Sequence, residues 1–262
     1  MSDQQIRFDD GAGYEQMMGK WSRLAGDIFL DWVAPTPGLE WLDIGCGNGA
    51  FTELLVERCA PRSVHGIDPS EAQIAYARTR HTAGIARFQI GSAMELPYGN
   101  ASTDAAVMAL VLFFVPKPAI GVAEMVRVTR PGGLVCAYAW DIEGGGFPME
   151  KVFSSMREQG LTPTLPPSAS AANIDAMRAL WESAGLRQVE TRQIRVRRRF
   201  ADFEEFWQAC LLGGGTRAAF ERLPPTALQV IKDHSRAKAG AEGANGLWVD
   251  AWANAVKGVV AG

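Results

Sequence analysis

Basic residues, histidines and cysteines are all scarce in this chain of 262 residues. Its 26 lysines and arginines are outnumbered by 29 aspartates and glutamates, which gives a formal net charge of −3. Proteins that bind nucleic acids normally carry a basic surplus that neutralises phosphates, so no nucleic-acid partner is expected. The three histidines, His65, His81 and His234, are scattered at no metal-ligand spacing, and we expect no metal site.

Long hydrophobic runs and paired cysteines are also missing. The longest apolar run, 105–115, is too short to cross a bilayer, and the first thirty residues carry several carboxylates and no signal-peptide pattern. The cysteines Cys46, Cys59, Cys136 and Cys210 form no Cys-x-x-Cys pair and are expected to be small apolar residues of a reducing compartment. We therefore expect a cytoplasmic protein without membrane insertion.

Hydrophobic periodicity and turn residues predict strands that alternate with helices. The expected helices are 14–34, 50–59, 70–80, 118–128 and 173–184. The expected strands are 40–44, 63–67, 87–90, 104–114 and 134–140, with two short strands at 187–192 and 194–200 that close a hairpin. The remaining stretch from Ala201 is expected to be mainly helical.

This alternation predicts an α/β fold. The expected architecture is a Rossmann-like, doubly wound, mostly parallel sheet of seven strands, with an antiparallel edge strand and helical lid elements. At roughly 150 residues per domain, the length corresponds to one enlarged domain, 1–262. Ligands of such sheets bind at the carboxyl ends of the strands, so function is expected there.

A glycine-rich turn follows the first expected strand. Gly45, Gly47 and Gly49 stand at alternate positions between that strand and the next helix, where bare backbone can lie against a ligand. Asp68 ends the second expected strand, and a carboxylate there can accept both hydroxyls of an adenosine ribose. The spacing from Gly45 to Ala50 also satisfies the relaxed dinucleotide fingerprint, so it leaves nicotinamide and adenosyl cofactors both open.

Asp43 favours the adenosyl cofactor, because a carboxylate at the strand end attracts a methionyl ammonium group and repels a pyrophosphate. The stretch Leu42-Asp-Ile-Gly-Cys-Gly-Asn-Gly49 resembles the first motif of class I S-adenosylmethionine-dependent methyltransferases. Asp68-Pro-Ser70 resembles the ribose-binding motif of that family, and Gly91-Ser-Ala-Met-Glu-Leu-Pro97 resembles the segment that encloses adenine. Arg127-Val-Thr-Arg-Pro-Gly-Gly133 is similar to the turn before the fifth strand. The resemblance covers about residues 40–140.

The N-terminal segment resembles a smaller group within that family, the ubiquinone/menaquinone-biosynthesis (type 11) methyltransferases. Tyr14 to Ser22 is similar to their first helix, which folds over the cofactor. The residues thereby expected at S-adenosyl-L-methionine, or its product S-adenosyl-L-homocysteine, are Tyr14, Trp21, Asp43, Gly45, Gly47, Asp68, Pro69, Ser92, Ala93, Met94 and Leu110. Ser92 replaces the aspartate of many relatives, and a neutral acceptor binds the adenine amino group more weakly than a carboxylate does.

The expected domain has five parts. These are an N-terminal helical lid (1–38), a cofactor-binding half (39–140), an insertion (141–172), a closing helix and hairpin (173–200) and a C-terminal helical segment (201–262).

The expected activity is methyl transfer to a small, apolar or aromatic acceptor. The alternatives are an NAD-dependent oxidoreductase and a non-catalytic adenosylmethionine-binding protein. The sequence names no general base, no acceptor atom and no oligomeric state. We expect 141–172 and the segment after Ala201 to form the acceptor wall, although Phe206 and Trp207 fit core packing almost equally well. Arg195, Arg197 and Arg199 alternate on one strand face, which fits a solvated surface better than an anion site.

Overall fold

The computed structural model describes residues 18–82, 84–212, 219–243 and 246–262. Its chain order is α2 (Lys20–Val33), β1 (Glu40–Ile44), α3 (Ala50–Cys59), β2 (Ser63–Asp68), α4 (Glu71–Ala77), β3 (Ala86–Ile90), β4 (Thr103–Ala109), η2 (Leu112–Phe114), α5 (Pro118–Val128), β5 (Thr129–Trp140), α6 (Glu150–Glu158), η3 (Ala169–Ala172), α7 (Ile174–Ser183), β6 (Arg187–Phe200), α8 (Phe203–Leu211), α10 (Pro225–Ala239) and β7 (Leu247–Val259).

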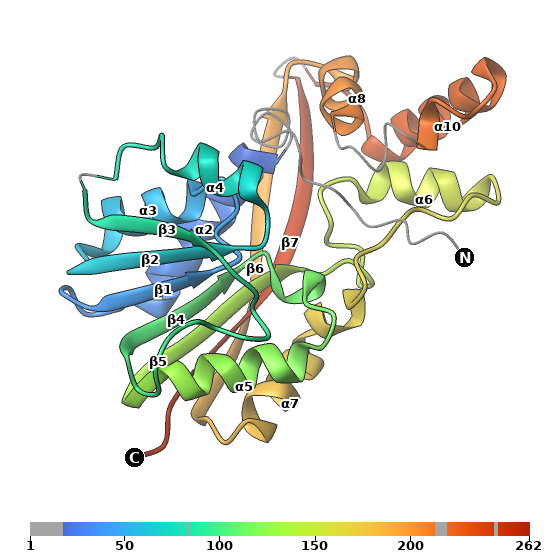
Figure 1. The fold of residues 1–262 in the computed structure, drawn as a ribbon. Coiled ribbons are helices and arrows are strands. Elements are labelled where there is room, and N and C mark those ends of the chain that lie inside the picture. Colours follow the sequence, from blue (N-terminus) through green and yellow to red (C-terminus); the bar gives the residue numbers. More distant parts are fainter. Residues whose placement is uncertain (1–17, 83, 213–218, 244–245) are drawn as a thin grey trace.

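The strands form one seven-stranded sheet in the order β3-β2-β1-β4-β5-β7-β6. β1 to β5 pair in parallel, and β7 runs antiparallel to both of its neighbours, β5 and β6. Helices α2 and α3 cover one face of the sheet and α5 and α7 cover the other (Figure 1). The expected α/β, doubly wound, seven-stranded class is confirmed.

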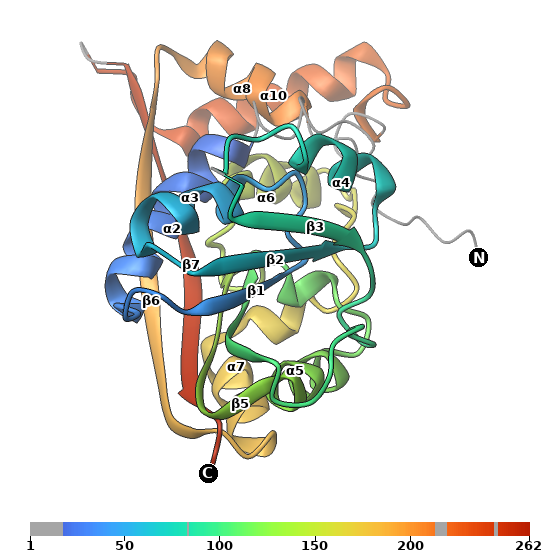
Figure 2. The ribbon, with the colours of Figure 1, turned by 60° about the vertical axis from the view of Figure 1, so that its left-hand side comes forward.

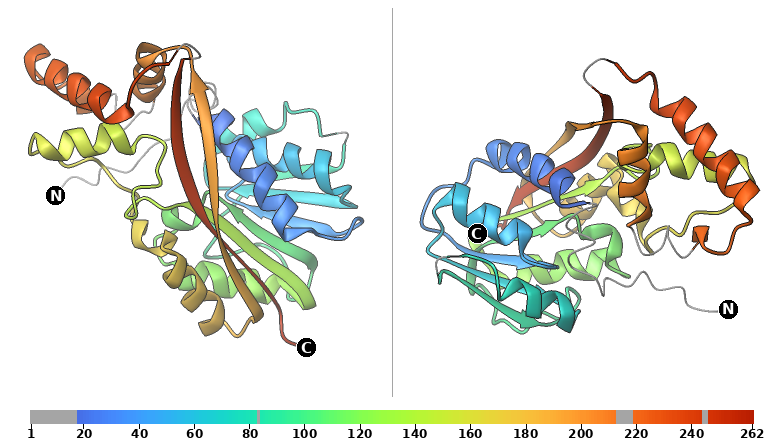
Figure 3. Two further views of the ribbon diagram at one scale, coloured as in Figure 1. Left: turned by 180° about the vertical axis from the view of Figure 1, so that it is seen from behind. Right: turned by 90° about the horizontal axis from the view of Figure 1, so that it is seen from above.

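Three helices lie away from these two layers. Figure 3 shows α6, α8 and α10 gathered near the end of β6 and the start of β7, and α10 packs against both α6 and α8. The segment 141–172, expected to be an irregular insertion, thus contains α6 and η3.

Several local signals give the observed elements. Helices α3 and α5 have the expected bounds, and Ser70 caps α4 by accepting a hydrogen bond from the Gln73 amide at 3.4 Å. The expected helix 14–34 is α2 within the described residues, and residues 14–17 lie outside them. The four cysteines are buried and free.

The end of β4 differs from the expected strand. The prediction of one strand over 104–114 is wrong, because β4 stops at Ala109 and Leu110 adopts a left-handed conformation with φ of +60°. A bulky residue rarely adopts this backbone geometry, which costs on the order of 1–3 kcal/mol. The amide of Leu110 donates to the Tyr138 carbonyl at 2.8 Å, so pairing with β5 holds the turn.

The C-terminal third departs most from expectation. The two short strands expected between 187 and 200 are one strand, β6, and its partner is β7, which lies in a segment expected to be helical. The antiparallel strand is therefore β7, inside the sheet between β5 and β6. Figure 2 shows β6 and β7 side by side along their whole length. Alanines, Asp250, Asn254 and Gly258 interrupt the valines and tryptophans of β7 and weaken its local strand signal, so pairing with distant residues decides the structure.

Helix α7 anchors this part of the sheet. It packs against β6 and β7, and the fully buried Trp181 indole donates to the Val135 carbonyl at 3.0 Å. The Asn173 side chain caps the helix by accepting from the amides of Asp175 (2.9 Å) and Ala176 (3.4 Å).

We expect Asn173→Ala to lower the free energy of unfolding by about 1 kcal/mol, because two amides at the helix start lose their acceptor. Urea denaturation followed by circular dichroism measures the change. Asn173→Ser is the matched control, since serine is an equally good cap. Equal losses in both variants would show that the side-chain cap is not the cause.

Candidate cofactor and acceptor site

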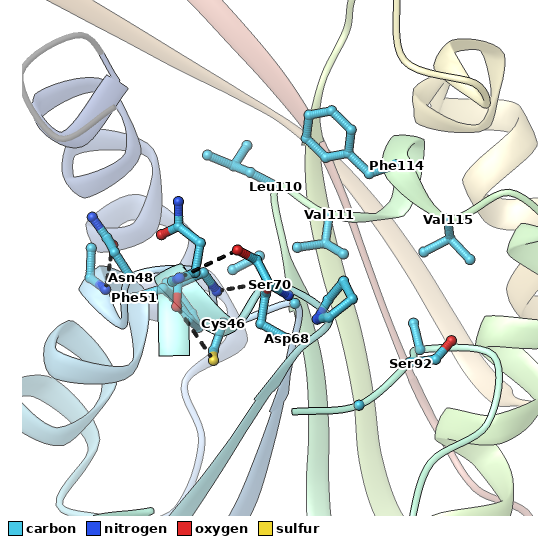
Figure 4. A pocket seen from close by; sticks show the side chains of 18 of the residues that line it. Cys46, Asn48, Phe51, Asp68, Ser70, Ser92, Leu110, Val111, Phe114 and Val115 are labelled. Atoms are coloured by element: carbon cyan, nitrogen blue, oxygen red, sulfur yellow. Dashed lines mark hydrogen bonds between the residues drawn. The ribbon is translucent and has the colours of Figure 1, made fainter. Parts of the chain in front are cut away.

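A cavity of about 900 Å³ lies where the carboxyl ends of β1, β2 and β4 meet (Figure 4). Four loops build most of it: those after β1, after β2, after β3 and after β4. The first turns of α3 and α4, Ser22 of α2 and Tyr138 of β5 complete the lining. Parallel pairing of β1 with β2 and β4 brings these strand ends to one edge, as expected for a doubly wound sheet.

Gly45 and Gly47 of the glycine turn lack a side chain for different reasons. Gly45 (φ +73°) donates its amide to the Ile67 carbonyl at 2.7 Å, and a Cβ on it would lie 2.5 Å from the Val111 side chain. Gly47 (φ +52°) has open space, because the nearest atom to a Cβ there is Gln73 Oε1 at 3.9 Å. The fold itself therefore requires Gly45, whereas Gly47 faces the cavity.

Asp68 connects two of the loops. Its Oδ2 accepts from the Gly47 amide at 3.0 Å and its Oδ1 accepts from the Ser70 amide at 2.8 Å. Partial burial raises the pKa of Asp68, while these two backbone hydrogen bonds lower it. Because a carboxylate has about four acceptor positions, two of them remain for a ligand.

Pro69, Ser92, Ala93, Met94 and Leu110 also line the cavity. The Ser92 hydroxyl oxygen accepts from the Met94 amide at 3.2 Å, which holds the loop after β3 closed on itself. The hydroxyl proton of Ser92 and its second lone pair are still available to a ligand.

The structure corrects the expected place of Asp43. This side chain is fully buried and absent from the cavity lining, because it points from β1 toward α3, where its Oδ2 accepts from Thr52 Oγ1 at 2.6 Å. Its Oδ1 has no hydrogen-bond partner among the described residues. Burial raises the pKa of Asp43 to about 7, and the nearby Asp68 charge adds to this rise.

The structure also corrects the place of Trp21. Its ring is buried beside Phe200 at 6.3 Å and does not line the cavity. The next residue, Ser22, is turned about 100° around the helix and does line it, with a buried Oγ that has no hydrogen-bond partner among the described residues. Tyr14 lies outside the described residues.

Sequence reasoning missed Ser22, Phe51, Gln73 and Tyr138 as lining residues. Phe51 and Gln73 lie in the first turns of the helices after the two motifs, so their positions were a usable signal. Ser22 and Tyr138 carried none, because only packing of α2 and β5 brings them to the cavity.

The expected acceptor wall is not found. Phe114 lines the cavity, but within the described residues no side chain after Tyr138 does so. Phe203, Phe206 and Trp207 are buried together, and Trp207 stacks on Phe220 with ring centroids 5.5 Å apart. Core packing therefore explains this helix face. Within the described residues, every residue that lines the cavity falls between Ser22 and Tyr138 in the sequence.

Neither a metal site nor a membrane-spanning helix is found among the described residues. The described residues contain no group of three histidine, cysteine or carboxylate side chains placed to hold a metal ion. Nor do they include a helix with the length and apolar character needed to cross a bilayer.

A doubly wound sheet with a glycine turn and an acidic residue at adjoining strand ends defines a nucleotide-cofactor-binding class of protein. Comparison with known proteins narrows this class. Residues 42–137 match the family described as a methyltransferase domain. Residues 42–137 therefore correspond to a methyltransferase domain of the class I, S-adenosylmethionine-dependent kind.

Individual relatives agree with this assignment. Malonyl-[acyl-carrier protein] O-methyltransferase from Pectobacterium atrosepticum is 31% identical over 128 residues, which are 49% of each chain. The chain spans about half the length of the curated relatives it matches.

Two solved structures share the fold. The YcgJ protein of Bacillus subtilis has a TM-score of 0.62 at 15% identity, covering 91% of this chain and 98% of its own. Phosphoethanolamine N-methyltransferase 2 of Haemonchus contortus has a TM-score of 0.59 at 15% identity, covering 97% of this chain and 58% of its own. The latter was solved with phosphomonomethylethanolamine and S-adenosylhomocysteine.

The buried Asp43 generates a prediction about pH. Because its folded pKa of about 7 lies above the ordinary value of 3.8, the folded state holds this proton more tightly than the unfolded state. The stability contribution of this group is full below about pH 4 and is lost as the pH rises to about 7. In Asp43→Asn the amide stays neutral, so this loss should disappear. Between pH 4 and pH 8 the wild type should lose several kcal/mol more unfolding free energy than Asp43→Asn, since one pKa unit is about 1.4 kcal/mol.

Unfolding free energies of both proteins measured from pH 4 to pH 8 test this expectation. Thr52→Val, which removes the hydrogen bond that lowers the Asp43 pKa, should extend the loss to higher pH. Parallel pH profiles for the wild type and Asp43→Asn would refute the assignment.

Proposed function

We propose that this protein transfers the methyl group of S-adenosyl-L-methionine to a small, uncharged and largely apolar acceptor. The observation that carries the proposal is the division of the cavity into a polar and an apolar side. Asp68 and the Gly45–Gly47 backbone line one side, and Leu110, Val111, Phe114 and Val115 line the other (Figure 4).

The polar side suits the cofactor. The two remaining acceptor positions of Asp68 match the two ribose hydroxyls, and the segment from Ser92 to Met94 is close enough to enclose the adenine. The open space at Gly47 gives the methionyl part access to bare backbone. Leu110 and Phe114, on the apolar side, would then be left to contact the acceptor.

The charge of the lining argues for an uncharged acceptor. Its titratable side chains within the described residues are Cys46, Asp68, Glu71 and Tyr138, and none of them is a lysine, arginine or histidine. An acceptor with a carboxylate or phosphate would meet no cationic side chain there, and only the sulfonium of the cofactor would compensate for its lost hydration.

The cofactor, when bound, supplies the electrophilic methyl group, and this chain supplies position and a dry environment. In-line transfer requires the acceptor atom, the methyl carbon and the sulfur on one axis, so holding both molecules in one apolar pocket carries much of the catalysis. Burial of Cys46 raises the pKa of its thiol, so this residue stays neutral rather than competing as a nucleophile.

Binding and turnover of the full chain test the proposal. Calorimetry should show binding of S-adenosylmethionine and S-adenosylhomocysteine but not of NAD or NADH; preference for NADH would identify an oxidoreductase instead. Methyl-labelled cofactor should then transfer its label to neutral aromatic acceptors more readily than to matched carboxylates. Binding without transfer to any acceptor would identify a non-catalytic binding protein.

A substitution at Gly47 tests the cofactor site more cleanly than one at Asp68. Removal of the Asp68 carboxylate would also leave the Gly47 and Ser70 amides without their acceptor. We expect Gly47→Ala to raise the dissociation constant for S-adenosylhomocysteine at least about tenfold, since its Cβ meets no protein atom and intrudes only on the ligand. The left-handed backbone should cost about 1 kcal/mol of stability.

Gly38→Ala is the matched control. Gly38 also has a positive φ of +82°, a Cβ on it would meet nothing within 4 Å, and it does not line the cavity. It should show a similar loss of stability with unchanged affinity. Equal affinities in the two variants would place Gly47 away from the ligand.

A further inference from the structure

A second cavity, of about 420 Å³, lies on β6 and β7 beneath the loop 145–148 and the start of α6. It shares no lining residue with the cofactor cavity. In Figure 1, α6 lies beside the upper part of β7. We propose that this cavity binds a small organic anion, with a carboxylate or phosphate group held by Lys151 and Arg195.

The strand register puts the charged residues that β6 and β7 contribute to this cavity on one face. Arg195 is paired with Trp252 and Arg197 with Asp250, and directly opposed residues of antiparallel strands point to the same side. This face is the expected alternating arginine face, and here it is covered in part by the loop 145–148.

The balance of charge is positive after internal pairing. Arg197 binds Asp250 through two hydrogen bonds, at 2.6 and 3.0 Å, and Glu150 is paired with Arg157. Lys151 and Arg195 form no ion pair within the described residues, yet both are close enough to lower the pKa of Asp250 in addition to Arg197. The lining therefore holds three cations and two carboxylates, a net charge of +1, and Lys151 and Arg195 are the cations available to a ligand.

The walls of the cavity suit an organic body rather than a bare ion. The Arg195 guanidinium lies over the Trp252 ring, 5.3 Å from its centroid, so the cation is already oriented. Phe147 and Pro148 add apolar surface to the lining. A planar or short aliphatic group can pack against these walls while its anionic end reaches Lys151 and Arg195.

The loop is held in place before any ligand arrives. The Trp252 amide donates to the Gly146 carbonyl at 2.9 Å, and the Trp252 indole donates to Asp141 Oδ2 at 3.2 Å. A Cβ on Gly146 would lie 2.3 Å from the Trp252 carbonyl oxygen, so the close approach depends on glycine. Such preorganisation lowers the entropic cost of binding.

The test is calorimetry on the full chain in a low-salt buffer free of phosphate. Phenyl phosphate and benzoate represent the two anionic groups, and inorganic phosphate and benzyl alcohol lack one half of the proposed ligand. At least one organic anion should bind about tenfold more tightly than inorganic phosphate, and benzyl alcohol should not bind. The stronger of the two organic anions identifies the preferred group.

Lys151→Met and Arg195→Met should each weaken binding of that anion at least about tenfold, because each removes a charged donor. Arg195→Lys, which keeps the charge, should retain most of the affinity. Arg192→Met is the matched control: it removes an exposed arginine of the same strand that lines neither cavity, and it should leave binding unchanged.

Affinity for S-adenosylhomocysteine, measured on the same variants, separates this proposal from the proposed function, since it should be the same in all of them. Absence of binding of either organic anion at millimolar concentration would overturn the proposal. So would an equal loss in Arg192→Met, which would mean that only general surface charge attracts the anion.

Discussion

The carboxylate of Asp68 is the interaction on which the cofactor side of the cavity depends. It stands at the end of β2 and accepts from one amide in the loop after β1 and from another at the start of α4. Gly45 and Cys46 in the first loop also donate to the Ile67 carbonyl, so three backbone amides of this loop converge on the last two residues of β2. A single strand end thus sets the distance between the glycine turn and the helix that faces it.

Charge is distributed unequally between the two cavities. The first has carboxylates and an apolar wall but no cationic side chain within its described lining, whereas the second has three cations, two carboxylates and an aromatic wall. Opposite sign and separate linings allow one chain to hold a cationic sulfonium and an organic anion without competition, because each charge is attracted to a different site. The proposed methyl transfer and the proposed anion binding can be tested separately, because the two cavities share no lining residue.

The elements that the sequence predicted correctly are those set by contacts between residues close in sequence, and the elements that it missed depend on contacts between distant residues. The bounds of α3 and α5 and the Ser70 and Asn173 caps follow from contacts within a few residues. β7 was missed, because alanines and polar residues interrupt its valines and tryptophans, and its pairing with β5 and β6 on either side decides the strand. The turn at Leu110 was missed as well. A hydrogen bond from the Leu110 amide to the Tyr138 carbonyl overrides the preference of leucine for negative φ.

The same division holds for the candidate site. By itself the sequence determined the α/β class, the glycine turn and the acidic end of β2, because strand ends and turns have local signatures. Only the tertiary structure decided which neighbouring side chains face the cavity. Asp43 and Trp21 point into the core, while Ser22, one residue from Trp21, points to the ligand space. Side-chain direction changes by about 100° for each residue of a helix and reverses at each residue of a strand, so it is settled by what packs against the element rather than by the motif that contains it.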